Sequence, residues 1–255
     1  EIASCLVGSE MCIRDSTYNA NMKSEKLIKR RLIIMYKFML NETSYHGAGA
    51  IKAVPEEIKA RGFKKVFVAS DPDLVKFGVT KKVTDLLDEA GIEYVLYSNI
   101  KPNPTIENVQ TGVAAFKEAG ADCIVAIGGG SSMDAAKVMW LMYEHPEVNF
   151  DDIKQKFMDI RKRAFKFPEL GKKAKLVCIP TTSGTGSEVT PFAVITDTKE
   201  NKKYPLTDYA LTPTIAIVDP EFAMSMPPRI AADTGIDVLT HAIEAYVSIL
   251  ASDFT

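Results

Sequence analysis

The sequence predicts an α/β fold, a parallel β-sheet with helices on both of its faces. Short apolar runs of strand length alternate along the chain with stretches whose apolar residues recur at helical spacing. Several of these helical stretches end at a glycine, and the apolar run at residues 123–127 leads directly into three consecutive glycines. Hydrophobic residues make up 46% and charged residues 25% of the 255 residues, which suits a soluble protein with a sizeable core.

The expected elements follow one another from residue 66 onward. Apolar, β-branched runs predict strands, and helical periodicity between them predicts helices. In chain order they are a strand at 66–70, a helix at 73–90, a strand at 94–97, a helix at 105–119, a strand at 123–127, a helix at 133–143, and strands at 176–180, 193–196 and 215–218. Because strand–helix–strand units cross over with one hand, their repetition predicts a doubly wound sheet.

The same criteria divide the chain into three parts. Residues 1–34 lack periodicity, and residues 5–16 resemble a translated cloning adapter, so we expect a non-native or disordered leader before a natural start at Met35. Residues 35–220 are expected to form the α/β domain. Residues 221–255 keep helical spacing without strand signals, which predicts the truncated start of a helical domain.

Charge, hydropathy and cysteine usage exclude several classes of protein. The formal net charge is −2, so no basic field favours nucleic acid or an anionic membrane as a partner. No apolar run reaches the roughly 18 residues of a membrane-spanning helix. The four cysteines form no Cys-x-x-Cys pair, and Cys123 and Cys178 lie in strand-like runs, which favours reduced thiols. We therefore expect a cytoplasmic protein with neither nucleic-acid nor membrane partners.

The triple-glycine turn at residues 128–130 is the first candidate binding site. Between a strand and a helix, glycines let the backbone approach a ligand closely, and the first amides of the helix point toward an anion. Ser131 and Ser132 follow, and they can cap the helix or donate to a phosphate. Taken alone, the glycines are equally compatible with a pyrophosphate site and with a simple tight connection.

A second polar loop, Thr181–Glu188, favours the nucleotide interpretation. It carries hydroxyls and glycines at the carboxyl end of the strand at 176–180, where open α/β sheets bind ligands. Asp71 follows the strand at 66–70 in the same way. Its carboxylate could bind an adenosine ribose diol and repel a 2′-phosphate, which would favour NAD over NADP. The alternative is that it caps a helix beginning at Pro72.

Asp237 and His241 are the candidate metal ligands. They stand four residues apart in a helical stretch and therefore share one face, about one turn apart. A carboxylate and an imidazole at this spacing can bind a divalent metal or can form a plain surface pair. A tetrahedral site needs further ligands. Either the metal interpretation is wrong, or the remaining ligands lie past Thr255.

Three motifs in order resemble the iron-activated (group III) alcohol dehydrogenase family. They are residues 128–137, 181–190 and 235–246. Two subgroups compete within the family. Residues 38–49 resemble lactaldehyde reductases (1,2-propanediol oxidoreductases). The segments that resemble the alcohol dehydrogenase half of bifunctional aldehyde–alcohol dehydrogenases are residues 142–146, 157–163 and 204–213.

The resemblance implies a Rossmann-like nucleotide-binding domain followed by an all-helical metal-binding domain, with NAD and Fe²⁺, or sometimes Zn²⁺, as cofactors. Asp71 would hold the adenosine ribose, and Asp134 would support the glycine turn. The remaining residues implied for the dinucleotide are Asn103, Gly129, Gly130, Ser131, Thr181, Thr182, Val194 and Lys203. Asp237 and His241 would be the first two metal ligands and the catalytic residues.

The implied reaction is a metal-assisted hydride transfer between NAD and a small primary alcohol or diol, of the ethanol or 1,2-propanediol/lactaldehyde type. The full-length protein is expected to be a homo-oligomer. Two alternatives stay open. One is a relative of glycerol dehydrogenases or dehydroquinate synthases with the same nucleotide fold, and the other is an inactive nucleotide-binding fragment.

Overall fold

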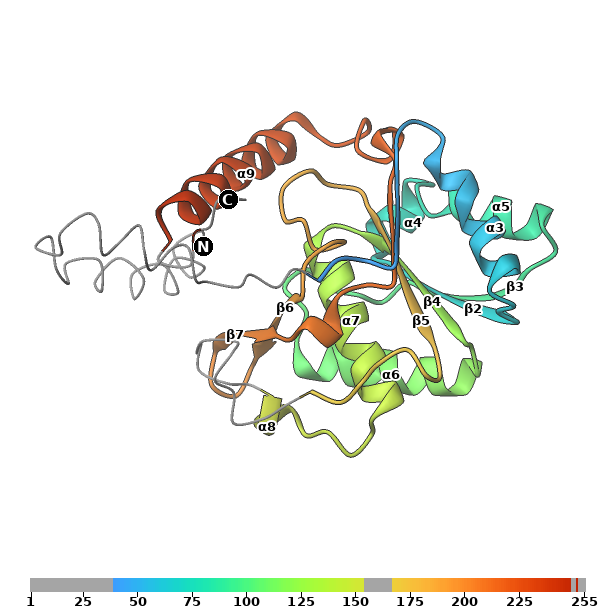
Figure 1. Ribbon diagram of the computed structural model, residues 1–255, viewed down its shortest axis with the longest axis horizontal. Coiled ribbons are helices and arrows are strands. Elements are labelled where there is room, and N and C mark those ends of the chain that lie inside the picture. Colours follow the sequence, from blue (N-terminus) through green and yellow to red (C-terminus); the bar gives the residue numbers. More distant parts are fainter. Residues whose placement is uncertain (1–38, 154–166, 249–250, 252–255) are drawn as a thin grey trace, which may run out of the picture.

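The computed structural model describes residues 39–153, 167–248 and 251 (Figure 1). The expected leader at 1–34 lies outside the described residues. So does the cationic cluster Arg161–Arg163, for which the sequence suggests only a solvated surface. None of the helices in the described ranges combines the length and the apolar content needed to cross a membrane.

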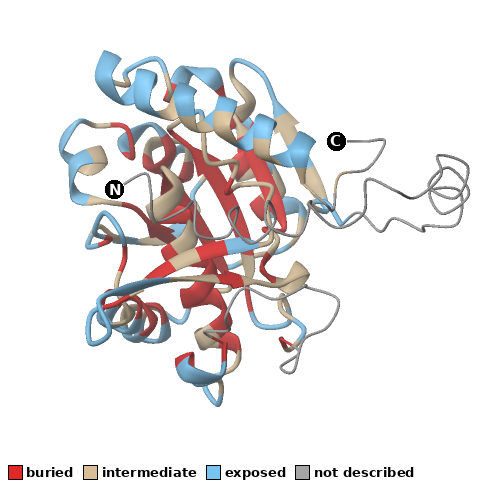
Figure 2. Ribbon diagram, turned by 90° about the vertical axis from the view of Figure 1, so that its left-hand side faces the viewer, coloured by how far each residue is buried: buried red, intermediate tan, exposed pale blue. Residues whose placement is uncertain are grey.

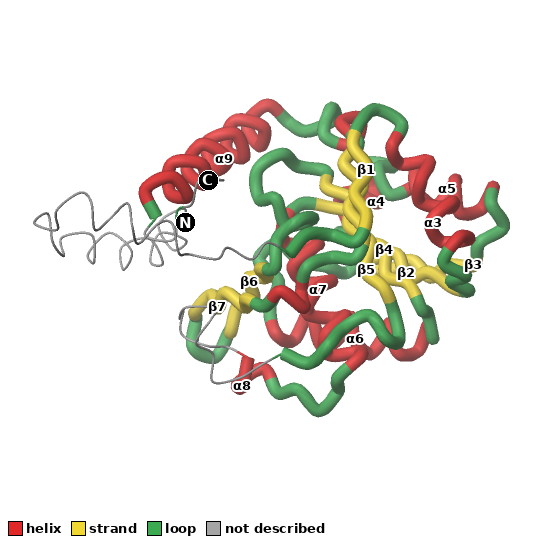
Figure 3. The backbone as a smooth tube through the Cα atoms, viewed as in Figure 1, coloured by secondary structure: helices red, strands yellow, loops and turns green. Residues whose placement is uncertain are grey.

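The structure contains the parallel sheet that the sequence predicts, and six strands form it (Figure 3). Every neighbouring pair in it runs parallel. From one edge to the other the strands are β1 (Thr43–His46), β8 (Ile215–Val218), β5 (Lys175–Pro180), β4 (Cys123–Gly128), β2 (Lys65–Ala69) and β3 (Glu93–Tyr97). Strand β4 is buried along its whole length, which accounts for its continuous apolar sequence.

Helices cover both faces of the sheet, because successive side chains of a strand point to opposite sides. The covering helices are α3 (Ala53–Ala60), α5 (Lys81–Glu89), α6 (Ile106–Ala119) and α7 (Gly130–Glu144). Val66 of β2 lies in one hydrophobic cluster with residues of α3 and α5, whereas Phe67 lies in the other with residues of α6 and α7. Figure 2 shows the buried residues concentrated in the sheet between these layers.

The prediction of one continuous helix at 73–90 is wrong. The helix expected at 73–90 is two helices, α4 (Pro72–Lys76) and α5, separated by a turn. Gly78 lies in this turn with a φ of 73°, in the left-handed region, and the N–H of Val79 bonds back to the carbonyl of Leu74 at 2.9 Å. The apolar spacing continues across the break because both helices face the same core, so periodicity alone did not reveal it.

A second, smaller sheet was not expected. The strand predicted at 193–196 is β6 (Phe192–Asp197), and it pairs antiparallel with β7 (Lys202–Thr207) instead of joining the parallel sheet. The sequence also did not predict β1, β7 or α3. Strand β7 contains Pro205 and exposed lysines, so it lacks the apolar alternation by which strands are recognised.

The last long helix, α9 (Pro228–Val247), confirms the helical stretch expected after residue 221. None of its residues is buried, and Figure 1 shows it standing apart from the helices that cover the sheet. Between the main elements lie α8 (Phe150–Ile153) and the 3₁₀ turns η3 (Ala50–Lys52), η4 (Tyr209–Leu211) and η5 (Pro220–Phe222).

An ion-pair network ties the start of the chain's first strand to α3 and β5. Arg61 lies 2.7 Å from both Glu42 and Glu57, and Lys175 lies 2.9 Å from Glu42. Hydrogen bonds from Lys175 and Arg61 lower the pKa of Glu42. Hydrogen bonds from Tyr45 and Arg61 lower the pKa of Glu57. The network therefore favours the charged form of both carboxylates.

We expect Arg61→Leu to lower the free energy of unfolding at neutral pH by about 1 kcal/mol, because partly exposed pairs contribute little each. Both glutamates titrate in the folded state below their unfolded value of about 4.3. Their stabilisation is thus present above that pH and is lost as the pH falls through the lowered values. Urea midpoints of the wild type and the variant should differ near neutral pH and converge in acid. A difference that stays constant, or that appears equally with Lys59→Leu on the exposed side of α3, would contradict this account.

Candidate functional site

The candidate site lies along the carboxyl ends of three neighbouring strands, β2, β4 and β5. Asp71 follows β2, the turn Gly128–Gly130 ends β4, and the loop Thr181–Glu188 follows β5. From β2 the chain runs outward to β3 and then returns to β4 on the other side of β2, so the strand order reverses between β2 and β4. Open α/β sheets bind ligands in the crevice at such a switch point.

The glycine turn forms a backbone cradle at the start of α7. Gly128 has a φ of 155°, in the region that favours glycine. A Cβ added to Gly129 would lie 3.2 Å from Thr182 Oγ1, and one added to Gly130 would lie 2.8 Å from Thr185 Cγ2. Gly129 is the N-cap of α7, and no side chain in the described part of the chain caps this helix. The first amides of α7 are therefore available to an anion, as a pyrophosphate site requires.

Asn103 and Ser131 meet beside this turn. The backbone N–H of Asn103 donates to Ser131 Oγ at 3.2 Å. Asn103 has a φ of 52°, a conformation that asparagine tolerates better than most residues. The contact places the turn at 101–104 against the start of α7, so these two residues predicted to bind the cofactor lie together.

Asp71 caps a helix and also reaches the glycine turn. Its Oδ1 accepts a hydrogen bond from the backbone N–H of Leu74 at 2.9 Å, which caps α4. Its Oδ2 accepts a longer one, at 3.4 Å, from Ser132 Oγ across the strand switch point. The capping interpretation is therefore confirmed, and the ribose interpretation stays a prediction.

Asp134 binds the polar loop and strand β6, and its expected support of the glycine turn stays a prediction. Its Oδ1 accepts from Ser187 Oγ at 2.7 Å, and its Oδ2 accepts from the backbone N–H of Val194 at 2.9 Å. Burial raises the pKa of Asp134, and the positive charge of Lys137 opposes that shift.

Lys137, like Asp134, connects α7 to the segment that leads into β6. The sequence had indicated no role for it. Its side chain is fully buried, and Nζ donates to the carbonyls of Thr190 and Phe192 at 2.8 and 2.7 Å. Burial lowers the pKa of Lys137, and Asp134 opposes that shift. The available signal was its position three residues after Asp134, on the same side of the helix.

The other predicted cofactor residues surround the same edge. Thr181 is buried, and its N–H donates to the carbonyl of Gly128 at 3.0 Å, which joins the two loops directly. Thr182 supplies the atoms nearest to a Cβ built on Gly129 in the glycine cradle. Val194 lies on β6, and its backbone N–H donates to Asp134 of α7. Lys203 is exposed on β7, where it pairs with Thr196 of β6. All four therefore belong to the loop and the hairpin that α7 supports.

Asp237 and His241 share one face of α9. Asp237 Oδ1 and His241 Nε2 are 3.7 Å apart, and both side chains are about half exposed. Two ligands about 2.1 Å from one tetrahedral ion lie about 3.4 Å apart, so small rotations would let both bind it. Within the ranges that the structure covers, no third histidine, cysteine or carboxylate joins them. The pair fits two positions of a metal site.

The two cysteines of the described chain are buried and free, as expected. They lie on neighbouring strands of the sheet, Cys123 on β4 and Cys178 on β5. Burial raises the pKa of both thiols, that of Cys178 to about 12. Burial therefore disfavours the thiolate of both residues, which is the form that acts as a nucleophile or binds a metal.

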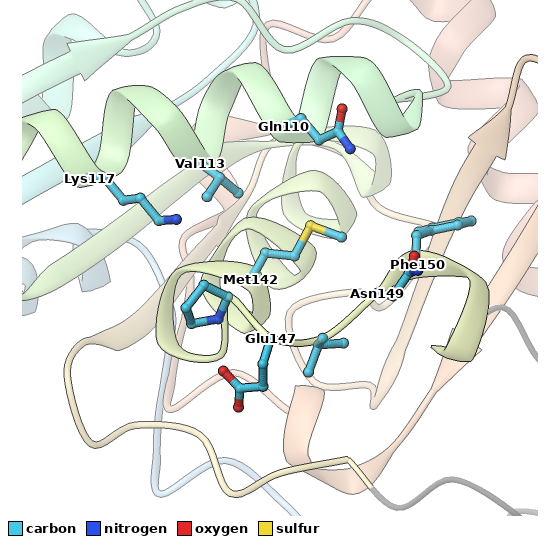
Figure 4. A pocket seen from close by; sticks show the side chains of 9 residues that line it. Gln110, Val113, Lys117, Met142, Glu147, Asn149 and Phe150 are labelled. Carbon is cyan, nitrogen blue, oxygen red and sulfur yellow. The ribbon is translucent and has the colours of Figure 1, made fainter.

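A surface cavity of about 390 Å³ lies elsewhere, between α6 and the segment that follows α7 (Figure 4). Its lining includes Lys117 on α6 and Met142 near the end of α7, opposite to the glycine turn at the helix start. None of the predicted cofactor or metal residues lines it. Its charged groups, Lys117 and Glu147, come from opposite sides and do not converge on one point.

Comparison with known proteins agrees with this geometry. The aldehyde-alcohol dehydrogenase 2 of Entamoeba histolytica is 50% identical over 241 residues, which are 94% of this chain and 27% of that protein. The NADPH-dependent butanol dehydrogenase of Clostridium saccharobutylicum is 47% identical over 87% of this chain and 54% of its own length. The lactaldehyde reductase of Escherichia coli is 39% identical over 83% of this chain and 53% of its own length. The chain therefore spans from about a quarter to about half of these relatives.

A solved structure resembles the fold as well. The sulfoacetaldehyde reductase of Bifidobacterium kashiwanohense, solved in complex with NAD⁺, matches with a TM-score of 0.70 and 28% identity over 84% of this chain and 54% of that one. Both subgroups suggested by the sequence occur among the relatives. Residues 41–220 match the family model described as iron-containing alcohol dehydrogenase, and the chain belongs to that family.

Proposed function

We propose that this chain binds NAD across the carboxyl edge of its sheet and is the cofactor-binding part of an NAD-dependent alcohol dehydrogenase or aldehyde reductase. The observation that carries the proposal is the uncapped, glycine-lined start of α7, enclosed by the loop Thr181–Glu188. The substrate is a small primary alcohol or diol, of the ethanol or 1,2-propanediol/lactaldehyde type, or the matching aldehyde. The whole protein is a homo-oligomer.

In this proposal each part of the edge holds one part of the dinucleotide. The first amides of α7, at Gly130 and Ser131, bind the pyrophosphate. Asp71 accepts from the adenosine ribose, with Asn103 beside it. The nicotinamide arm lies toward the loop and the hairpin that Asp134 and Lys137 support. There it meets Thr181, Thr182, Val194 and Lys203.

Asp237 and His241 hold Fe²⁺, or Zn²⁺, in the same proposal. The ion, when bound, is a Lewis acid for the oxygen of the alcohol or aldehyde. The carboxylate and the imidazole would hold it on the α9 face that carries both side chains. The loop and the hairpin hold the nicotinamide ring in place for hydride transfer.

Titration with NADH tests the proposal on the 255-residue chain. Trp140 is the only tryptophan of the sequence and is buried in α7, ten residues after Gly130 and so about 15 Å along the helix. Bound NADH should quench its fluorescence by energy transfer, with saturation. Absence of saturable quenching up to about 1 mM NADH, an affinity of only about 4 kcal/mol, would contradict nucleotide binding.

Asp71 sets the preference for NADH over NADPH in this proposal. Asp71→Asn keeps an N-cap of equal quality and removes the charge. We expect it to tighten NADPH binding about tenfold relative to NADH, because the repulsion of a 2′-phosphate at about 5 Å is on the order of 1–3 kcal/mol. Asp71→Gly should act in the same direction.

The matched control for this prediction is Asp73→Asn, which removes one exposed carboxylate from the first turn of the same helix. The ratio of the two dissociation constants, from Trp140 quenching, is the measurement. If the ratio is unchanged in Asp71→Asn, Asp71 does not face the ribose. Because one relative is an NADPH-dependent butanol dehydrogenase, a site in which Asp71 does not exclude the 2′-phosphate is the specific alternative.

A second candidate function is nucleotide binding without dehydrogenase activity. It is favoured by the presence of only two metal ligands in the described ranges. The 255-residue chain with Fe²⁺ or Zn²⁺ should then bind NADH but reduce neither propanal nor lactaldehyde. Turnover of either at an ordinary rate would exclude this candidate, and NADH oxidation with dihydroxyacetone alone would point to a polyol dehydrogenase instead.

A further inference from the structure

The polar loop after β5 touches helix α9 at Gly184. A Cβ built on Gly184 would lie 2.9 Å from Thr234 Cβ, 2.9 Å from the Thr234 carbonyl oxygen and 3.2 Å from Thr234 Cα. Two of these three atoms are backbone, so no rotamer change can relieve the contact. Gly184 does not have a positive φ. Its glycine is therefore required by the close approach of α9 and not by the conformation of its own backbone.

The hydroxyl group of Thr234 is bonded within its own helix and takes no part in this contact. Its Oγ1 donates to the carbonyl of Ile230 at 2.9 Å, within its own helix. The Cβ and the carbonyl oxygen of Thr234 are the atoms nearest to a Cβ built on Gly184. Figure 1 shows the loop between β5 and β6 extending toward α9.

Thr234 shares its helix face with the proposed metal ligands. Asp237 and His241 follow it by three and seven residues, spacings that place all three side chains on one side of a helix. Thr234 and Asp237 are partly shielded, whereas Ile236 is more than half exposed. The face that meets the nucleotide loop is thus the face that carries the ligand pair.

The contact at Gly184 matters because little else holds α9. No residue of the helix is buried, so its position depends on a few surface contacts. The loop end of this contact lies two residues from Thr182, beside the glycine cradle of α7. A change in the distance between Gly184 and Thr234 therefore changes the distance between the metal ligands and the cofactor edge.

We propose that Gly184 is a positioning residue that sets the distance between the Asp237–His241 pair and the bound nicotinamide. The proposal rests on the proposed function, because it takes the nucleotide edge and the ligand pair as given there. A side chain at Gly184 pushes α9 outward by about 0.5–1 Å, the difference between 2.9 Å and an ordinary non-bonded contact. The cofactor cradle itself stays in place, since Gly129 and Gly130 do not contact α9 in this way.

The test compares Gly184→Ala with Gly235→Ala in the 255-residue chain. Gly235 lies next to Thr234, and a Cβ there would meet no atom within 4 Å. Mn²⁺ is added as a paramagnetic probe of the ligand pair, and its relaxation of the nicotinamide protons of NAD⁺ is measured by NMR. That relaxation falls with the sixth power of distance, so we expect about a twofold loss in Gly184→Ala for a displacement of about 0.5–1 Å, and no loss in Gly235→Ala. Equal relaxation in both variants would overturn the proposal.

Trp140 quenching by NADH separates this result from a failure to fold. In Gly184→Ala the NADH affinity should stay within about threefold, which is less than 1 kcal/mol. Asp237→Asn should abolish the relaxation in every background. If Asp237→Asn changes nothing, the metal site of the proposed function fails. If it abolishes the relaxation while Gly184→Ala leaves it intact, only the role of Gly184 fails.

A cross-link tests the contact without any cofactor. The ideal Cβ positions at Gly184 and Thr234 are 2.9 Å apart, and disulfides need about 3.5–4.5 Å. The double variant Gly184→Cys with Thr234→Cys should therefore close a disulfide after a small outward shift, with oxidised glutathione accepting the two electrons. The pair Gly184→Cys with Gly235→Cys should form far less of it on a non-reducing gel. Equal cross-linking of the two pairs, or none in the first, would overturn the contact and the proposal with it.

Discussion

We expect the chain carrying Gly129→Asp to fold and to lose most of its affinity for NADH. Gly129 is the N-cap of α7 with an extended backbone, φ −79° and ψ −170°, which aspartate adopts without strain. Aspartate is among the best N-cap residues and gains a few tenths of a kcal/mol over glycine. Its carboxylate would, however, occupy the amides that the pyrophosphate needs and place a negative charge against it. The free energy of unfolding should therefore rise slightly, while the affinity for NADH falls.

The expected loss of NADH affinity is at least about 100-fold. Two hydrogen bonds to a charged group are worth about 1.5–3 kcal/mol each, and each 1.4 kcal/mol is about tenfold in affinity. Gly129→Ala is the matched control, because its Cβ meets Thr182 at the same distance without adding a charge. It should lose far less affinity. Trp140 quenching measures binding and urea unfolding measures stability; an Asp variant that binds NADH normally would remove the pyrophosphate from α7.

The second large effect is expected from Lys137→Met, which should lower the free energy of unfolding by about 3–5 kcal/mol. Methionine fills a similar volume but leaves the carbonyls of Thr190 and Phe192 without a donor and Asp134 without its neighbouring cation. Removing a buried cation that donates to two carbonyls and lies near a buried carboxylate costs about this much. Lys117→Met, on the exposed side of α6, is the control and should stay within about 0.5 kcal/mol.

The pH dependence of this loss has a definite sign. Burial already raises the pKa of Asp134, and removing Lys137 takes away the charge that opposes the shift. A raised folded-state pKa favours the protonated, uncharged carboxyl, so the destabilisation of Lys137→Met should shrink as the pH falls from about 8 to about 5.

A double variant checks that the Asp134–Lys137 pair is the cause. Asp134→Asn combined with Lys137→Met removes the unpaired charge and should cost at least about 1 kcal/mol less than the sum of the single changes. Urea unfolding of the four proteins gives the cycle. Strict additivity would mean that Lys137 acts through the two carbonyls alone.

The glycine turn shows how far local sequence reaches. Three glycines between a strand and a helix predicted a backbone cradle, and the uncapped start of α7 has that form. The spacing of Asp237 and His241 likewise predicted one shared helix face, and the two lie 3.7 Å apart on α9. Asp71 shows the limit of such patterns. The sequence allowed a helix cap and a ribose ligand, and the cap is what the fold itself shows.

Other parts of the site depend on partners far along the chain. Lys137 is an ordinary charged residue in a helical motif until β6 and its loop return to cover it, 53 and 55 residues later. Gly184 is one flexible residue in a polar loop until α9 arrives against it. The antiparallel pairing of β6 with β7 and the break at Gly78 were missed for local reasons, because β7 lacks apolar alternation and the apolar spacing of α4 and α5 continues across Gly78.

The sequence by itself determined the alternation of strands and helices, the parallel sheet, the glycine turn and the placement of Asp237 and His241 on one helix face. Each of these follows from residues within a few positions of one another, through backbone freedom and periodicity. The tertiary structure alone decided which charges are buried, which loop Asp134 holds, and where α9 meets the loop that follows β5. Those outcomes depend on desolvation and on contacts between distant segments, and neither exists until the chain has folded.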